Sequence, residues 1–322
     1  MDLTIITKQE KRREGLFGIE KIMLCYWILT TLLIFLLGNE LVEREQMLIE
    51  RLCILVGTVA TFALYNWLPS RFTSTLRILF QMALLSYWYP DTYQFNCLFG
   101  NLDCYFAGIE QLLFNCQPAV EFSKLFSSYF WCELFNLGYF SYFPMIGTVA
   151  LYALFAKYHK FEKTTFIILC SFLLYYIIYV FIPVAGPQYY FNAIGLNNVD
   201  TCNFYHVGTW FKDHTEMLPA PGHGGFFQHL IEIAHEGERP TAAFPSSHVG
   251  ISTILMILAY KLNRKLMIGL LPFYILLCLS TVYIQAHYAI DVIAGWLSAI
   301  LVYKLSHQLY YSKLFYPYDP NK

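Results

Sequence analysis

Long apolar runs separated by short polar stretches dominate the chain. A helix that crosses a bilayer needs about 20 mostly apolar residues, because the hydrocarbon core is about 30 Å thick. Six runs meet this requirement clearly, at 22–38, 52–68, 139–156, 164–184, 266–284 and 288–305. Two weaker runs, 76–89 and 247–262, need their aromatic and polar ends to reach both interfaces. The pattern predicts an all-α fold, a polytopic membrane helix bundle with about eight transmembrane helices.

Composition supports this interpretation. Charged residues make up 13% of the chain, whereas soluble domains carry about 25%. The net charge is −1 and no basic block stands out, so we expect the lipid bilayer, and no nucleic acid, as a partner. A basic stretch at 8–13 precedes the first apolar run, and no small-residue cleavage site follows Gly38. We therefore expect an uncleaved first membrane helix rather than a signal peptide.

The distribution of lysine and arginine sets the expected orientation. Eight crossings place both termini on one side of the membrane, and that side carries most of the 21 basic residues. The exceptions are Arg44, Arg51, Lys124, Lys212 and Arg239. Under the positive-inside rule, both termini are cytoplasmic. We expect a multi-pass protein of the cell membrane.

Two long segments, about 90–138 and 185–244, then face outward. The stretch 105–114 has the spacing of an amphipathic helix lying on the membrane surface, although the segment around it could simply cap the bundle. Five cysteines lie in these outward segments: Cys97, Cys104, Cys116, Cys132 and Cys202. Disulfides and free thiols both stay open, because pairing cannot be read from sequence. We divide the chain into N-terminal transmembrane helices (1–90), an extracytoplasmic aromatic, cysteine-containing segment (91–138) and a catalytic core (139–322).

Candidate chemistry lies at the ends of the last apolar runs. His287 and Asp291 are four residues apart, so they share one helix face, where the carboxylate can accept a hydrogen bond from the imidazole. That bond would fix the tautomer and leave the other ring nitrogen free to attack. A purely structural His–Asp pair is the alternative. Ionisable groups at membrane depth are nevertheless costly and usually functional.

A second group of polar residues precedes the run at 247–262. Ser246 or Ser247 is placed to cap a helix N-terminus, whose free N–H groups and dipole bind phosphate. His248 lies in the first turn. Arg239, nine residues upstream of it, can grip phosphate oxygens through its fork of donors. The expected topology brings Arg239, His248 and His287 to the outer membrane face.

These residues resemble the type 2 phosphatidic acid phosphatase superfamily, whose signature is KxxxxxxRP, then PSGH, then SRxxxxxHxxxD. Arg239-Pro240 matches the first element, and Pro245-Ser246-Ser247-His248 matches the second with serine in place of glycine. Ser280, His287 and Asp291 match the third at the correct spacing. The resemblance covers roughly 186–295 and implies a six-helix phosphatase-like core within 139–322.

The resemblance also implies roles for these residues. His287 would attack phosphorus and form a phosphohistidine, Asp291 would orient it, and His248 would protonate the leaving group. Arg239, Ser246 and the backbone at Ser247 would hold the phosphoryl oxygens. No metal and no cofactor are implied.

The chain departs from the family signature at two cations. Glu232 stands where the first-element lysine would fall, and Thr281 stands in place of the third-element arginine. The sequence around both histidines looks closer to the branch containing inositol phosphorylceramide synthases, which pass a phosphoryl head group to a lipid alcohol. Replacement contacts to the substrate could come from Lys212 or from neutral donors: Gln188, Tyr189, Tyr190 and Gln285.

We therefore predict an integral-membrane enzyme acting on a membrane lipid phosphate or diphosphate at the outer face. Hydrolysis is favoured, because no acceptor pocket can be recognised; transfer to a lipid alcohol is the alternative. A metal-binding protein is a second hypothesis, based on the loop histidines His206, His214, His223, His229 and His235, whose spacings fit no tight ligand motif. A non-catalytic scaffold is a third, against which the presence of His248, His287 and Asp291 weighs.

Overall fold

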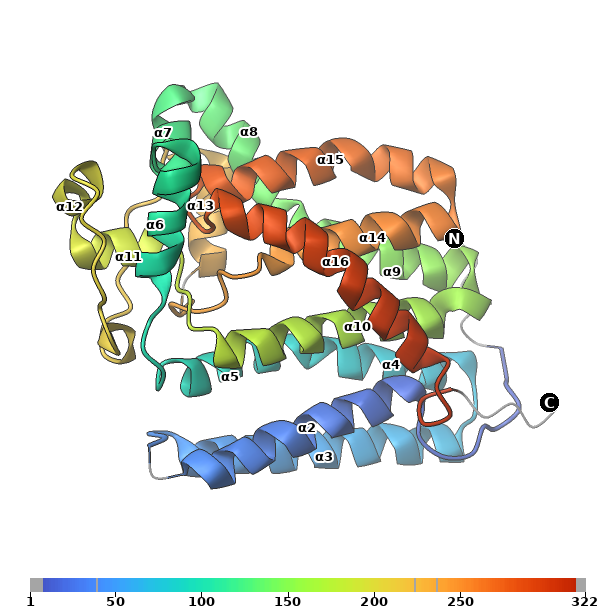
Figure 1. Ribbon diagram of the computed structural model, residues 1–322. Helices are drawn as coiled ribbons and strands as arrows, with labels where there is room; N and C mark the ends of the chain where they lie inside the picture. The colour runs from blue at the N-terminus through green and yellow to red at the C-terminus, as the bar shows by residue number, and fades with distance from the viewer. Residues whose placement is uncertain (1–7, 39, 223, 236, 317–322) are drawn as a thin grey trace. The chain divides into compact units, whose positions relative to one another are not determined.

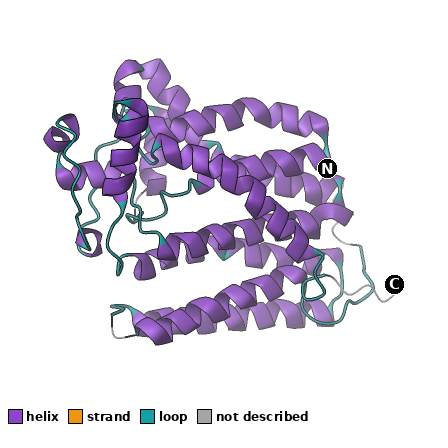
Figure 2. Cartoon of the chain, viewed as in Figure 1, coloured by secondary structure: helices purple, strands orange, loops and turns teal. Residues whose placement is uncertain are grey.

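The computed structural model describes residues 8–316 except 39, 223 and 236, and within them the secondary structure is helical. Figure 2 shows helices joined by loops, and the described residues contain one isolated β-bridge, between Gln9 and Ser70. The predicted all-α class is therefore confirmed. The chain divides into two compact units: residues 1–89, 150–173 and 303–322 form the first, and residues 90–149 and 174–302 form the second.

The first unit contains α2 (Gly18–Leu37), α3 (Arg44–Trp67) and α4 (Arg71–Ala83). Ser70 caps α4, because its side chain accepts the N–H of Thr73. A fully buried ion pair between Arg77 and Glu20 ties α4 to α2. Breaking such a pair leaves an uncompensated buried charge, so the pair fixes how these two helices pack.

The second unit carries every residue that the sequence proposes for the site. Its helices include α6 (Asp103–Phe114), α7 (Pro118–Leu125), α8 (Tyr129–Phe140), α11 (Pro187–Ile194), α12 (Leu196–Asp200), η1 (Trp210–Lys212), α13 (Phe226–His235), α14 (Ser247–Leu262) and α15 (Arg264–Tyr283). Helix α15 packs along both α14 and α8 (Figure 1), and α8 also packs against α13. Four helices contribute residues to both units: α5 (Leu85–Asn96), α9 (Tyr142–Ala156), α10 (Tyr158–Phe181) and α16 (Ala289–Tyr310).

The helices can be compared with the predicted spans. Five described helices are long and apolar enough to cross a membrane: α2, α3, α10, α15 and α16. The pair α8 and α9, bent by 40°, makes a sixth candidate if it is one span, and α14 is a shorter apolar helix. The weak run at 76–89 is divided between α4 and α5 at Leu84, a single residue between the two helices whose N–H still bonds the carbonyl of Phe80. The chain is a membrane protein, and the count of eight spans stays a prediction.

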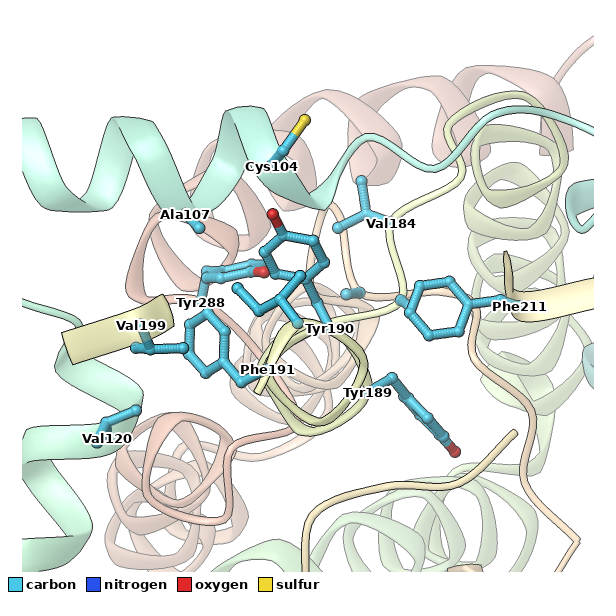
Figure 3. Close-up of a cluster of buried hydrophobic side chains, with 13 residues drawn as sticks. Cys104, Ala107, Val120, Val184, Tyr189, Tyr190, Phe191, Val199, Phe211 and Tyr288 are labelled. Atoms are coloured by element: carbon cyan, nitrogen blue, oxygen red, sulfur yellow. The ribbon is translucent and has the colours of Figure 1, made fainter. Parts of the chain in front are cut away.

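A buried aromatic cluster joins α6, α11 and the residue that follows His287. Figure 3 shows Tyr190 and Phe191 of α11 facing Tyr288, with Cys104 and Ala107 of α6 beside them. Tyr189 points away from these rings, although its side chain is also buried. Burying large aromatic side chains stabilises such a cluster strongly. The cluster therefore packs α6 and α11 against Tyr288, the residue that follows His287.

Candidate functional site

The two histidines predicted from the sequence lie side by side. His248 occupies the first turn of α14, and His287 lies in the turn between α15 and α16. The Nε2 atom of His287 is 3.3 Å from Nδ1 of His248, and the ring centroids are 5.5 Å apart. The expectation that segments 39 residues apart bring both imidazoles to one place therefore holds in the structure.

The hydrogen bonds of His287 fix its tautomer. Its Nδ1 lies 2.8 Å from the carbonyl oxygen of Ala243, and a carbonyl can only accept, so Nδ1 carries the proton. Burial lowers the pKa of His287 to about 4, against the opposing influence of this hydrogen bond and of the carboxylate of Glu238. The ring is neutral at pH 7, so Nε2 has a lone pair that faces His248.

Asp291 lies beside His287, but it makes a different bond from the one that the i, i+4 spacing predicts. Its Oδ2 is 3.7 Å from Nδ1 of His287 and accepts the N–H of Tyr288 at 2.9 Å. The orienting hydrogen bond comes instead from Ala243. Asp291 therefore caps α16 and places a carboxylate next to the imidazole without bonding it. The sequence did not predict the role of Ala243, because every residue has a main-chain carbonyl and no side-chain pattern indicates which one will accept a hydrogen bond.

The start of α14 is built as expected, with one difference at the backbone. Ser246 is the N-cap, and its hydroxyl accepts the N–H of Val249 at 3.4 Å. The N–H of Ser247, expected to hold phosphate, instead donates to the hydroxyl of Tyr179 at 2.9 Å. Ser246 and Ser247 are both buried. The two serines therefore shape the helix start, and their role as direct phosphate ligands stays a prediction.

Two tyrosines from α8 and α9 flank His248. The ring centroids of Tyr139 and Tyr142 lie 4.6 and 4.5 Å from the centroid of the imidazole. Aromatic rings at this separation pack directly against the imidazole. Tyr139 lies before the bend between α8 and α9 and Tyr142 lies after it, and both rings contact His248.

Arg239 is exposed and lies above the ring of Tyr93, with its guanidinium carbon 5.9 Å from the ring centroid. The positive charge of Arg239 interacts electrostatically with the hydroxyl of Tyr189. Tyr93 and Glu238 interact with the same hydroxyl. The Tyr189 hydroxyl is buried and has no hydrogen-bond partner among the described residues. A buried unpaired hydroxyl costs free energy, so this donor is available to a ligand near Arg239.

The other two proposed contacts belong to the segments that support His287. The N–H of Gln188, near the start of α11, donates to the carbonyl of Gln285 at 2.9 Å. Gly186 precedes α11 with φ +97°, and a Cβ there would lie 2.6 Å from the carbonyl oxygen of Ala286. Only glycine tolerates that backbone conformation together with so close an approach. The segment from Gly186 to Gln188 therefore packs directly on the turn that carries His287.

Two acidic residues of α6 also hold this turn, and sequence reasoning missed both. The Asp103 carboxylate accepts the N–H groups of Ala185 at 2.6 Å and Gly186 at 2.8 Å, and the Tyr288 hydroxyl at 2.9 Å. Glu110 accepts the N–H of Ile290 at 3.1 Å, in the first turn of α16. Both side chains are fully buried. The available signal was their spacing of seven residues in an aromatic stretch, with Ala107 between them on the same face.

The two missing cations are replaced by groups with other partners. Glu232, in α13, accepts a hydrogen bond from Gln228 at 2.8 Å. Thr281 is buried, its hydroxyl donates to the carbonyl of Cys278, and its own carbonyl accepts the N–H of His287 at 3.1 Å. Thr281 thus holds the backbone of His287, whereas an arginine here would have supplied charge.

The loop histidines proposed as metal ligands can be checked where the structure describes them. Within the described part of the chain, no group of three or more His, Cys, Asp or Glu side chains is arranged to hold a metal ion. His214 stacks on Trp210, and His206 lies 3.1 Å from the Cys104 sulfur. His223 and the side chain of His235 lie outside the described residues.

Cysteine pairing stays open. The structure shows no disulfide among its described residues. The thiols of Cys104 and Cys132 contact polar groups instead, with the Cys132 sulfur 3.3 Å from the carbonyl oxygen of Pro221.

Comparison with known proteins gives one result of substance. A family model described as the PAP2 superfamily matches residues 109–305. No curated protein and no solved structure gives a significant match. The matched range covers more than half of the chain, and it contains Arg239, His248, His287 and Asp291.

Proposed function

The chain belongs to the PAP2 superfamily, and from this premise we propose that it is an integral-membrane phosphatase that cleaves a lipid phosphate or diphosphate through a phosphohistidine. The observation that supports the proposal most strongly is the histidine pair. A neutral, buried His287 has its lone pair directed toward His248 at 3.3 Å. A nucleophile beside an acid–base partner is the arrangement that phosphoryl transfer through a covalent intermediate needs.

The proposed reaction has two steps. Nε2 of His287 attacks phosphorus, an N–P bond forms, and the P–O bond to the lipid breaks while His248 gives a proton to the leaving oxygen. Water then attacks the phosphohistidine with His248 as base, which releases phosphate and restores both rings. Before the first step, the substrate has to displace the hydrogen bond that joins the two imidazoles in the resting site.

Asp291 and Arg239 have electrostatic roles in this scheme. The phosphorylated His287 ring carries positive charge when Nδ1 keeps its proton, and Asp291 lies 3.7 Å from that atom. The guanidinium of Arg239 and the hydroxyl of Tyr189 would bind phosphoryl oxygens, because both are donors and lie within electrostatic reach of one another. Gln188 and Gln285 are further proposed contacts.

The proposed location follows from the charge distribution. Lysines and arginines concentrate on the loops assigned to the side of the termini, which supports cytoplasmic termini and a site on the opposite face of the cell membrane. A membrane lipid phosphate within the bilayer is the proposed substrate.

Transfer of a phosphoryl head group to a lipid alcohol is the alternative, since a phosphohistidine reacts with an alcohol as it does with water. The sequence around His248 and His287, which looks closer to the branch containing inositol phosphorylceramide synthases, supports this alternative. The purified protein would be given phosphatidic acid or a polyprenyl diphosphate, with and without ceramide or diacylglycerol. Phosphate release without an acceptor supports hydrolysis, and turnover that requires the acceptor supports transfer.

A variant pair tests the covalent step itself. We expect His287→Ala to abolish turnover and to leave no acid-labile, base-stable phosphate on the protein. His229→Ala, in an exposed histidine of α13, is the matched control and should behave as wild type. Turnover at the wild-type rate in His287→Ala would rule out the mechanism.

A further inference from the structure

Helix α16 begins between two buried carboxylates that come from distant parts of the sequence. Asp291, in its first turn, accepts the N–H of Tyr288, and Glu110 of α6 accepts the N–H of Ile290 at 3.1 Å. Both side chains have no exposed surface. The N–H groups at a helix start and the helix dipole favour negative charge, but they favour it for one carboxylate more readily than for two.

Each carboxylate has one oxygen left over. Oε2 of Glu110 and Oδ1 of Asp291 are buried and have no hydrogen-bond partner within the described residues. An ionised carboxylate with an unpaired buried oxygen is expensive, and two of them at one helix end repel each other. A proton on one of the two groups removes most of this cost.

The surroundings decide which group keeps the proton. The charge of Asp291 acts on Glu110, and Glu110 acts in turn on the Cys116 thiol. Asp103 and Tyr288 interact with Asp291, and Glu121 interacts with Cys116. Burial, and then the charge of Asp291, raise the pKa of Glu110 to about 8, against the lowering effect of the α16 backbone N–H groups. Burial disfavours the charged form of Asp291 as well. A charged Asp291 is favoured once the phosphorylated His287 ring carries its positive charge in the proposed reaction.

We propose that Glu110 is a positioning residue of the active site: in its protonated form it fixes the start of α16 beside Asp291, and so holds His287 for attack. Glu110 acts through Ile290 and Asp291 and does not touch the substrate. Deprotonation would add a second buried negative charge at the same helix end and loosen the contact between α6 and α16. The catalytic part of this inference rests on the proposed function, whereas the charge state of Glu110 does not.

The first experiment measures kcat against pH for the full-length protein with phosphatidic acid in vesicles. Wild type should lose activity as the pH rises through about 8, by up to about tenfold per pH unit, because the protonated form disappears. Glu110→Gln keeps a neutral acceptor for Ile290, so it should retain kcat within a few fold and lose this alkaline decline. Glu110→Ala removes the acceptor and should lower kcat by about tenfold or more, with KM little changed. Glu121→Gln, at an exposed carboxylate of α7, is the matched control and should keep the wild-type profile.

A second experiment needs no activity. A group whose pKa is raised on folding makes the folded protein less stable as the pH rises from the unfolded value, about 4.5, to the folded value, about 8. The melting temperature of wild type should therefore fall relative to that of Glu110→Gln across this window and then run parallel to it. Melting temperatures of wild type and Glu110→Gln that run parallel over the whole pH range would overturn the proposal. So would a Glu110→Gln enzyme that keeps the alkaline decline or is as impaired as Glu110→Ala.

A protein that never turns over phosphate but shows the predicted difference in melting temperature contradicts the proposed function and leaves the charge state of Glu110 supported.

Discussion

At the scale of single residues, the orientation of His287 depends on a backbone atom. The Ala243 carbonyl holds Nδ1 at 2.8 Å, while Asp291 stands at 3.7 Å and bonds the Tyr288 N–H. The His–Asp spacing predicts that Asp291 both orients the imidazole and stabilises its positive charge. In the structure the Ala243 carbonyl orients the ring, and Asp291 is placed only to stabilise the charge. A substitution of Asp291 removes the charge and leaves the tautomer in place.

We accordingly expect Asp291→Asn to fold normally and to lose rate. The amide oxygen can still accept the Tyr288 N–H, so the melting temperature should stay within a few degrees of wild type. The rate kcat should fall by about 10–100-fold, because a charge next to a developing cation contributes on the order of 1.4–3 kcal/mol. Single-turnover phosphorylation of His287 measures the step directly. An unchanged phosphorylation rate would exclude an electrostatic role for Asp291.

Tyr189 and Tyr190 allow a sharp comparison between neighbours. The Tyr189 hydroxyl is buried without a partner in the described structure, whereas the Tyr190 hydroxyl donates to the carbonyl of Tyr205 at 2.8 Å. We expect Tyr189→Phe to lower kcat/KM by about tenfold, since one donor to a phosphoryl oxygen is lost, and to leave stability unchanged or improved. Tyr190→Phe should instead lower the melting temperature and spare kcat/KM. The opposite pattern in initial-rate and melting measurements would remove Tyr189 from the site.

At the scale of elements, helix α6 shows where sequence reasoning stops. The stretch 105–114 predicts an amphipathic helix, and α6 spans it. Its inner face carries buried Asp103, Ala107 and Glu110, while Leu112 and Leu113 are exposed. The periodicity reveals that the helix has two faces, but the partners of the acids are backbone N–H groups about 80 and 180 residues away. Such contacts depend on tertiary packing, so capping and hydrophobic patterns alone could not locate them.

The turn before α11 can be tested with two glycines that share a backbone conformation. Gly186 and Gly195 both have positive φ, at +97° and +81°, but only Gly186 would place a Cβ against another backbone, at Ala286. We expect Gly195→Ala to cost about 1–3 kcal/mol of stability from the conformation alone. Gly186→Ala should cost more, because the steric clash adds to the strain, and should also lower activity, because Ala286 adjoins His287. Equal effects in thermal unfolding and in activity would mean that the close approach has no functional weight.

At the scale of the whole molecule, the lengths of the apolar runs predicted most of the long helices but did not predict where the helices begin and end. The weak run at 247–262 became α14 with the same bounds, because Ser246 caps it at one end and Asn263 ends it at the other. The run at 76–89 failed as one helix, since hydropathy does not register the break at Leu84. The chemistry-bearing residues were found from their spacing to one another, whereas the residues that support them were not.

The orientation of the chain in the membrane is the broadest prediction, and a single cysteine can test it. Cys202 is exposed in the loop between α12 and η1, a segment that the charge distribution places on the far side from the termini. We expect a membrane-impermeant maleimide to label Cys202 in intact cells. Cys202→Ser should weaken that signal, and the half-buried Cys97 and Cys116, expected on the same side, would account for the remainder. Labelling of Cys202 only in permeabilised cells would place the histidine pair on the cytoplasmic face. The enzyme would then act on lipids of the inner leaflet, because α11 and the segment that carries Cys202 pack with the turn that holds His287.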